Sequence, residues 1–135
     1  MYVTFPLVRE KNLLLKILLE TKKAIANLIN SILQYEYLYK RISLDKNPKE
    51  NFKTFIKKCA PRYLITKEEI DKIEELFEII ELHNKSPMEF TREEKIVIMS
   101  ENSSVKTISI EKTKEFLNIG KSLLKKTKDT IGRIN

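Results

Sequence analysis

The sequence has little of three residue types that build common functional sites: its 135 residues include two glycines, one cysteine and one histidine. Two glycines are too few for the glycine-rich loops that hold phosphates in nucleotide-binding folds. A single cysteine, Cys59, excludes an internal disulfide framework and a cysteine cluster for zinc. We therefore expect no metal site and no cofactor, and a reducing compartment fits best.

Long apolar runs are also lacking. The longest uncharged stretch, Ala24 to Tyr35, has twelve residues, whereas a bilayer span needs roughly 20. Met1 to Arg9 has no basic stretch before an apolar run and no small-residue cleavage site, as a secretory signal would. These absences predict a cytoplasmic protein without a membrane partner.

The composition that remains is typical of one folded domain. Hydrophobic residues make up 41% of the chain, which is too apolar for a disordered segment. A chain of this size buries roughly two-thirds of its unfolded surface on folding. We expect a single helical domain over residues 1–135.

The spacing of apolar residues predicts the elements of this domain. From Arg9 to about Arg41 they recur at three- and four-residue steps without Gly or Pro, which indicates one helix on the order of 45 Å long. Its first turns, Leu13 to Leu19, are apolar on nearly all sides, so that end is either the centre of the core or a contact with another chain.

Two capping signals predict the next two helices. Asn47 followed by Pro48 and Glu50 is typical of a helix start, and this helix should run to about Cys59 before Pro61 stops it. Thr66-Lys67-Glu68-Glu69 is a capping box that opens a helix to about His83, with an almost wholly acidic outer face.

The period then changes to that of strands. Lys95 to Ser100 and Val105 to Ile110 are β-branched runs on either side of Glu101-Asn-Ser-Ser104, which predicts a β-hairpin within about residues 88–110. From Glu111 to about Ile131 the pattern is helical again, with Gly120 at a close helix crossing and Leu124 among the inward residues. The predicted fold is mainly α: a four-helix bundle with a long first helix and a small hairpin before the last.

Charge is sorted by segment. Lys40 to Arg62 carries eight basic residues against two acidic, and Lys112 to Arg133 carries seven against two. Thr66 to Asn84 carries two basic against seven acidic. If the two basic helices lie side by side, their lysines would line one surface able to follow a phosphate backbone. The alternative is that they are solvated faces that pair with the acidic helix. The candidate nucleic-acid contacts are Lys49, Lys53, Lys57, Lys58, Arg62, Lys121, Lys125 and Lys128.

Single residues with possible chemistry have ordinary structural explanations. Tyr37 lies on a different face from Tyr35 and Tyr39, so its ring is a candidate for stacking on bases, although most such tyrosines are core or rim residues. Cys59 lies on an apolar stripe and lacks a nearby base, which predicts a buried, inert thiol. His83 has no metal-ligand partners at helical spacing.

Three strings together resemble a group of small, lysine- and isoleucine-rich archaeal proteins of unassigned function: Tyr35-Glu-Tyr-Leu-Tyr-Lys-Arg41, Cys59-Ala-Pro-Arg-Tyr63, and Ser86-Pro-Met-Glu-Phe-Thr-Arg92 with the run after it. A long first helix and a basic last helix also resemble the HEPN-type helical bundles of RNA-processing and toxin systems. The HEPN catalytic signature, an arginine followed four to six residues later by histidine, is missing before His83. This resemblance implies binding of RNA or protein without catalysis.

Two functions are consistent with the sequence, and neither is enzymatic. The first is a basic helical module that contacts RNA or a ribonucleoprotein particle. The second is a subunit that binds a protein partner or a second copy through Leu13 to Leu19 or the hairpin edge. RNA binding requires the second and fourth helices to be contiguous, whereas assembly requires Leu13 to Leu19 to be partly exposed. A HEPN-type RNase is a distant third.

Overall fold

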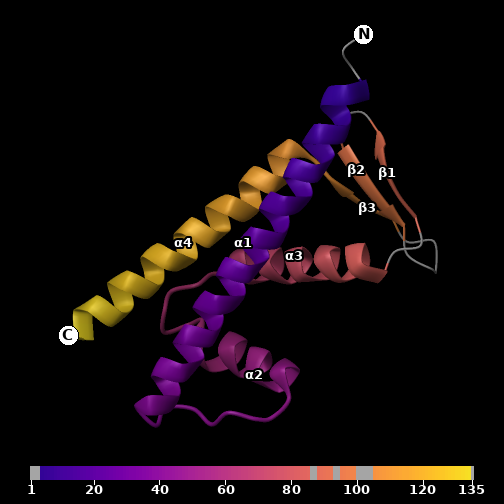
Figure 1. The fold of residues 1–135 in the computed structure, drawn as a ribbon. Coiled ribbons are helices and arrows are strands. Elements are labelled where there is room, and N and C mark those ends of the chain that lie inside the picture. Colours follow the sequence, from indigo (N-terminus) through magenta and orange to yellow (C-terminus); the bar gives the residue numbers. More distant parts are fainter. Residues whose placement is uncertain (1–3, 86–87, 93–94, 100–104, 135) are drawn as a thin grey trace.

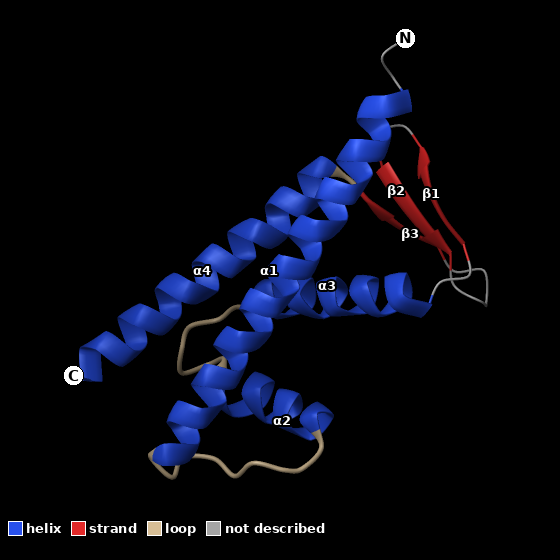
Figure 2. Ribbon diagram, viewed as in Figure 1, coloured by secondary structure: helices blue, strands red, loops and turns tan. Residues whose placement is uncertain are grey.

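The computed structural model describes residues 4–85, 88–92, 95–99 and 105–134, with side chains for 13–84 and 109–132. The described chain is mainly helical, as the sequence predicts (Figure 1 and Figure 2). The helices are α1 (Thr4–Leu38), α2 (Pro48–Thr54), α3 (Lys67–Lys85) and α4 (Ile110–Ile134), and a π-helical turn, η1 (Phe55–Cys59), continues α2. The strands are β1 (Met88–Arg92), β2 (Lys95–Met99) and β3 (Val105–Ile108).

The long helix α1 is the central element of the fold. Figure 1 shows α4 crossing it and running in the same direction, α3 lying across it, α2 at its foot and the sheet beside its first half. Among the described side chains of α1, the apolar ones with no exposed surface are Leu18, Ile25 and Ile32, at seven-residue intervals that return to one face every two turns. They form one core with the buried residues of α3 and α4.

Helix α1 begins and ends earlier than the predicted range of Arg9 to Arg41. Pro6 lies within its first turn, where a missing N–H costs nothing. Lys40 ends the helix in the left-handed region with φ of 60°, so that the Arg41 N–H donates to the Glu36 carbonyl at 3.0 Å. This is a Schellman closure in which lysine takes the position usually held by glycine.

Both predicted helix starts form their caps, but Glu50 does not reach back to Asn47, whose N–H donates to the Asp45 carboxylate at 2.8 Å instead. The Asn47 side chain accepts from the Lys49 N–H at 3.0 Å, and Pro48 opens α2. At the start of α3 the Thr66 N–H donates to the Glu69 carboxylate at 3.0 Å while the Glu69 N–H donates to Thr66 Oγ at 3.2 Å. This reciprocal pair is the capping box, and it satisfies two backbone donors that the helix leaves free.

The second helix changes its hydrogen-bond pattern where the sequence predicted an uninterrupted α-helix. At η1 the Ala60 N–H donates five residues back, to the Phe55 carbonyl at 2.8 Å. Pro61 cannot donate, and the segment closes with Leu64 at φ of 59° and the Ile65 N–H bonded to the Ala60 carbonyl at 2.9 Å. The wider turn buries Phe55 and Cys59 against α1.

The sheet has three strands where the sequence analysis expected two. Strand β2 lies in the centre and pairs antiparallel with β1 and with β3. The pairing of β2 with β3 joins the two runs in which the hairpin was expected, and β1 adds the segment Met88–Arg92 on the other side. The expected turn at residues 101–104 lies outside the described residues, and Ile110 belongs to α4 instead of a strand.

Gly120 lies at the crossing of α4 and α1, as predicted. A Cβ atom placed on it would meet Ile25 Cγ1 at 3.7 Å, an ordinary van der Waals distance. Leu124, by contrast, was expected to point inward and is 42% exposed. The helical period identifies the apolar side of α4 but does not show how much of that side α1 and α3 cover.

Candidate functional site

The eight residues predicted to contact phosphate are all exposed, but they fall into two groups. The first group lies on α2, on η1 and just after η1. The second group lies on α4, which packs chiefly on α1 and α3. Figure 1 shows α2 at the foot of α1, away from most of α4. Leu64, in the loop after η1, shares a hollow with Lys128 near the end of α4. The structure therefore does not place the two basic helices side by side.

Two members of the first group already have acidic partners. The Arg62 Nε atom lies 3.3 Å from the Glu36 carboxylate, and Lys53 Nζ donates to Glu50 at 3.3 Å. The Glu50 pair is exposed and contributes little to stability. The Arg62 side chain is about one-third exposed and pairs with a buried charge.

Glu36 is the buried charge at this junction, with a side chain only 2% exposed. Arg41 Nη1 donates to its carboxylate at 2.9 Å, and Arg62 approaches the other oxygen. The Tyr63 hydroxyl donates to the same carboxylate at 3.3 Å, and burial together with the Glu36 charge raises the pKa of Tyr63. The ends of α1 and η1 are thereby joined through one carboxylate.

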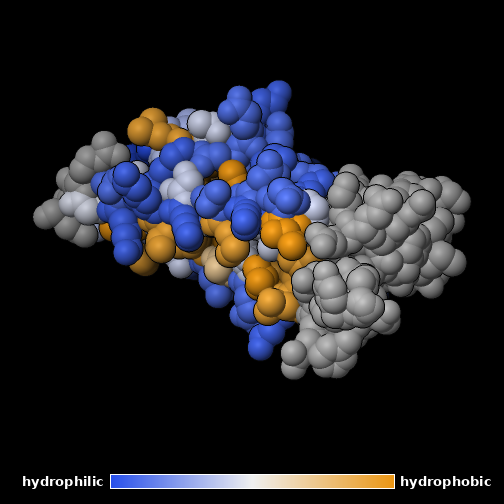
Figure 3. Space-filling view, turned by 90° about the horizontal axis from the view of Figure 1, so that it is seen from above, coloured by the Kyte–Doolittle hydropathy of each residue, from blue (hydrophilic) through white to orange (hydrophobic). Residues whose placement is uncertain are grey.

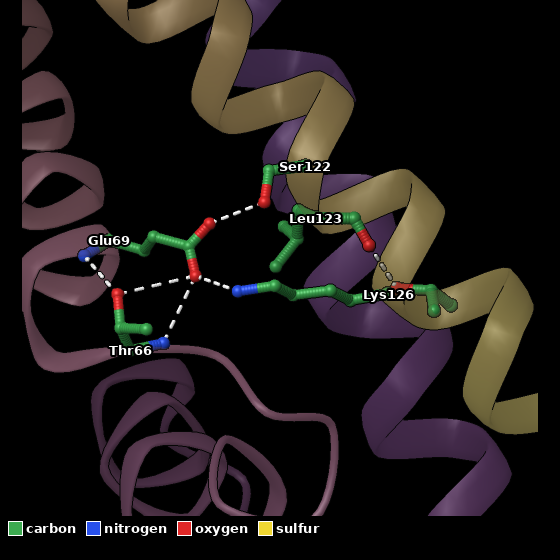
Figure 4. A network of polar contacts seen from close by, with 6 residues as sticks. Thr66, Glu69, Ser122, Leu123 and Lys126 are labelled. Carbon is green, nitrogen blue, oxygen red and sulfur yellow. Dashed lines mark hydrogen bonds and ion pairs between the residues drawn. The ribbon is translucent and has the colours of Figure 1, made fainter.

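A second polar network joins α3 to α4, and Figure 4 shows its geometry. The Glu69 carboxylate accepts from Ser122 Oγ at 2.5 Å, from Lys126 Nζ and from the Thr66 cap. Burial alone would raise the pKa of Glu69, but the hydrogen bonds from Lys126, Ser122 and Thr66 outweigh it and hold this pKa below its usual value. Lys126 is therefore a partner of α3 and not part of an open basic face.

Further along the same edge of α4, acidic and basic side chains alternate. Lys112 Nζ lies 2.6 Å from Glu75, and Lys72 on α3 lies 3.3 Å from Glu115. The acidic helix thus neutralises the near edge of α4, as the alternative interpretation of the charges expected. The lysines on the outer edge of α4 do not take part in these bridges.

The outer edge of α4 carries lysines and leucines in two neighbouring rows. Leu117 and Leu124 are seven residues apart. Lys114, Lys121 and Lys128 are also spaced seven residues apart. Residues seven apart in a helix lie on one line, and the leucine and lysine rows are separated by less than a quarter turn. All five are exposed, so α4 presents an apolar row bordered by a basic one.

The apolar row of α4 faces a matching row on α1. Leu13, Ile17 and Ala24 line a hollow of about 480 Å³ together with Leu117, and Lys16 and Glu20 lie at its α1 side. Leu13 is 58% exposed and Leu117 is 37% exposed. Figure 3 shows apolar side chains gathered into a strip on this side of the molecule, bordered by hydrophilic ones. We call this hollow, together with the exposed Leu124 seven residues further along the apolar row of α4, the α1–α4 groove.

The start of α1 is partly exposed, which is what assembly through Leu13 to Leu19 would require. Leu18 is fully buried and Leu14 nearly so, whereas Leu13 is open to solvent. Leu15 and Leu19 are half-buried. The stretch Leu13 to Leu19 therefore belongs partly to the core and partly to the surface. The core explanation therefore applies to the buried face, and contact of the exposed face with another chain stays a prediction.

The remaining candidates have the positions that ordinary packing predicts. Tyr37 is half exposed, while the rings of Tyr35 and Tyr39 are tilted by 45° to each other with centroids 4.8 Å apart. Cys59 is fully buried, and burial followed by the Glu36 charge raises its pKa to about 11. His83 is half-buried near the end of α3. Among the described residues no group of three or more histidine, cysteine or acidic side chains could hold a metal ion.

Sequence reasoning missed Glu36 and misplaced Leu124. Glu36 continues the buried series of Ile25, Ile29 and Ile32 on α1, and an acid at such a position signals an internal ion pair. Its partners come from another segment, which the period of α1 cannot identify. The exposure of Leu117 and Leu124 depends on the angle at which α4 crosses α1, and this angle is a property of packing.

A scan against protein-family models and searches of curated proteins and of solved structures find no match to this chain. In the described part of the chain, no helix combines the length and the apolar character needed to cross a bilayer.

Proposed function

We propose that this protein is a non-enzymatic binding module whose α1–α4 groove holds an acidic amphipathic helix of a protein partner. The observation that carries the proposal is the exposed leucine row of α4 beside the lysine row Lys114, Lys121 and Lys128. A helix lying in a groove is a common mode of peptide recognition, read by apolar anchors at three-, four- and seven-residue spacing.

The apolar part of the groove supplies the anchors. Leu13, Leu117 and Leu124 are large, exposed and supported from beneath by the core, since Leu14, Phe116 and Leu123 beside them in sequence are buried. Covering such side chains releases free energy of roughly 25 cal/mol per Å² of apolar surface. Exposed apolar rows with a polar border are typical of interaction sites.

The positive charge of the lysine row beside the groove favours an acidic partner. In a two-fold dimer through this face, the lysine rows of the two copies would approach each other, and like charges at an interface are unfavourable. An acidic helix avoids this repulsion. It would place carboxylates beside Lys121 and Lys128 while its apolar side covers Leu117 and Leu124.

The test uses a fluorescently labelled synthetic helical peptide with leucines three and seven residues apart and glutamates on its flanks. Fluorescence anisotropy should show saturable binding, and Leu117→Ser combined with Leu124→Ser should weaken it about tenfold or more. The matched control is Leu38→Ser, because Leu38 is 73% exposed at the end of α1, outside the groove. A scrambled peptide of the same composition controls for charge alone.

Two results would contradict this proposal. One is equal binding of the ordered and scrambled peptides. The other is a dimer in sedimentation velocity that Leu124→Ser converts to monomer, which would make the groove an interface between copies of this chain.

RNA is the second candidate, favoured by one observation. Lys121, Lys125 and Lys128 lie on the outer side of α4, away from the acidic partners of Lys112 and Lys126. Three such ammonium groups on neighbouring turns offer three contacts to a phosphate backbone. Lysine outnumbers arginine on this face, however, and arginine is the better reader of bases and phosphate.

The RNA candidate is tested by anisotropy with a structured RNA from about 50 to 300 mM salt. The triple variant Lys121→Glu, Lys125→Glu, Lys128→Glu should abolish binding, and the slope of log affinity against log salt should be about −2 to −3 for three phosphate contacts. The paired control Lys57→Glu, Lys58→Glu changes the other basic group. No RNA binding at low salt, together with binding of the ordered peptide, would decide for the protein partner.

A further inference from the structure

A second groove lies on the opposite side of α1, between α1, α2 and α3. It has a volume of about 640 Å³ and is walled mainly by apolar side chains. The residues that form its apolar wall are Ile29, Leu33, Leu44, Phe52, Ile56 and Phe77. Pockets for small molecules typically have volumes of roughly 300–1,000 Å³ and mostly apolar walls, so this groove has the size and character of a ligand site.

The walls of this groove are held in place by contacts among the residues that line it and their neighbours. The Phe52 ring lies 5.7 Å from Phe77 and 6.1 Å from Phe55, measured between centroids, so α2 and α3 are held together by aromatic packing. The Asn51 amide donates to the Asp45 carbonyl at 2.9 Å and its oxygen accepts from the Asp45 N–H at 2.7 Å. This pair anchors the loop that carries Leu44 into the groove.

The polar groups of the groove lie at its rim and are unevenly charged. Lys49 and Lys53 come from α2, and Asn30 and Gln34 stand on the α1 side. Glu74 is the one acidic residue among the described residues that line the groove. The rim therefore offers the Lys49 ammonium, the Lys53 ammonium that also pairs with Glu50 at 3.3 Å, and two amides to a ligand whose apolar part lies against Phe52 and its neighbours.

A peptide helix fits this shape less well than a small molecule. A helix with its side chains is about 10–12 Å across, and a stable protein interface covers about 800 Å² on each partner. An open apolar groove lined by helices and a loop suits a flexible chain. We propose that this groove binds an amphiphile with an unbranched apolar chain and an anionic head, namely a medium- or long-chain carboxylate, with Lys49 and Lys53 at the head.

The first test is calorimetric titration of the protein with dodecanoate below its micelle concentration, and with dodecanol as the uncharged control. Dodecanoate should bind at one saturable site. The double variant Lys49→Glu, Lys53→Glu should lower the affinity for dodecanoate about fivefold or more. It should change the affinity for dodecanol by no more than about twofold. Both lysines are exposed, so this variant should fold normally. The matched control is Lys121→Glu with Lys125→Glu on α4, which should change neither ligand.

A second measurement locates the ligand without any substitution. In ¹H–¹⁵N spectra, dodecanoate should shift the amide signals of Phe52, Ile56 and Phe77 most strongly. Absence of saturable binding would overturn the proposal. Shifts centred on Leu117 and Leu124 would also overturn it, because they would place the ligand in the α1–α4 groove. Absence of saturable dodecanoate binding does not bear on the acidic-helix proposal, whose test uses a different groove and a different ligand.

Discussion

The carboxylate of Glu36 lies almost entirely out of water and is shared by two arginines from different segments. Arg41 follows the end of α1, and Arg62 follows η1. Lys40, directly before Arg41, has left-handed backbone and turns the chain toward this acid, and Leu64, two residues after Arg62, has left-handed backbone as well. Such conformations cost of order 1 kcal/mol or more in residues other than glycine, and the ion pairs help to hold them.

We expect Glu36→Gln to lower the free energy of unfolding by about 2 kcal/mol, because two guanidinium groups lose a buried counter-charge. The arginines are about one-third exposed and can turn to water, which keeps the loss below that of a fully buried pair. Urea denaturation measures the change. The control is Glu50→Gln, whose exposed pair with Lys53 should contribute no more than about 0.5 kcal/mol. Equal effects of the two substitutions would show that Glu36 is not the centre of this junction.

Cys59 should be inert while the protein is folded. Its pKa is raised to about 11, so roughly one thiol in a thousand is ionised at pH 8, and the side chain is fully buried. Mass spectrometry should show slow alkylation by iodoacetamide in buffer and rapid alkylation in urea. Native labelling as fast as that of the unfolded chain would mean that η1 opens readily.

Helices α3 and α4 are joined through Glu69, and this contact should make their association depend on pH. The pKa of Glu69 in the folded protein lies below its ordinary value of 4.5. The stabilisation is therefore complete above that ordinary value and is lost as the pH falls through the folded pKa. At pH values below about 4.5, we expect the urea concentration at the unfolding midpoint of the wild type to decrease as the pH is lowered. The midpoint of Glu69→Gln should decrease less over the same pH range.

The matched control for this pH dependence is Glu68→Gln, an exposed neighbour on the same turn. It should leave the pH profile of stability close to that of the wild type. A wild-type profile that Glu69→Gln leaves unchanged would assign the acid sensitivity to other carboxylates.

The crossing of α4 over α1 leaves room for one more carbon at Gly120. Since an added Cβ would meet Ile25 at 3.7 Å, Gly120→Ala should raise the free energy of unfolding by about 0.5–1 kcal/mol through the lower helix propensity of glycine. Thermal unfolding followed by circular dichroism measures it. Gly132→Ala, which meets nothing within 4 Å, is the control in the last turns of α4. Destabilisation by Gly120→Ala alone would indicate a tighter crossing than the structure shows.

Helix starts could be predicted from the sequence, whereas the π-helical turn and the end of α1 could not. The starts of α2 and α3 could be predicted from Asn47 and Thr66, because a cap bonds to backbone groups within three residues. The π-helical turn at Phe55–Cys59 could not, since α and π patterns share the same apolar residues over one turn. The end of α1 was predicted too late in the sequence, because Lys40 ends the helix in the left-handed conformation that glycine usually marks.

The candidate surfaces depend on arrangement in space, which the sequence does not report. The lysines of α2 and α4 were predicted as one possible surface, and the structure separates them. Lys126 and Lys112 were indistinguishable in sequence from Lys121 until α3 brought Glu69 and Glu75 beside them. Binding of RNA and the resemblance to HEPN-type proteins remain predictions.

The parallel course of α1 and α4 has a consequence for how the chain is made. Parallel neighbours cannot be joined by a short turn, so α2, α3 and the sheet carry the chain back to the start of α1 (Figure 1). A ribosome adding about 5–20 residues per second needs several seconds to travel from Leu38 to Ile110. During that time the face of α1 around Ile25 has no α4 to cover it. This part of the core is the last to close, and on a nascent chain it is the apolar surface most in need of a chaperone.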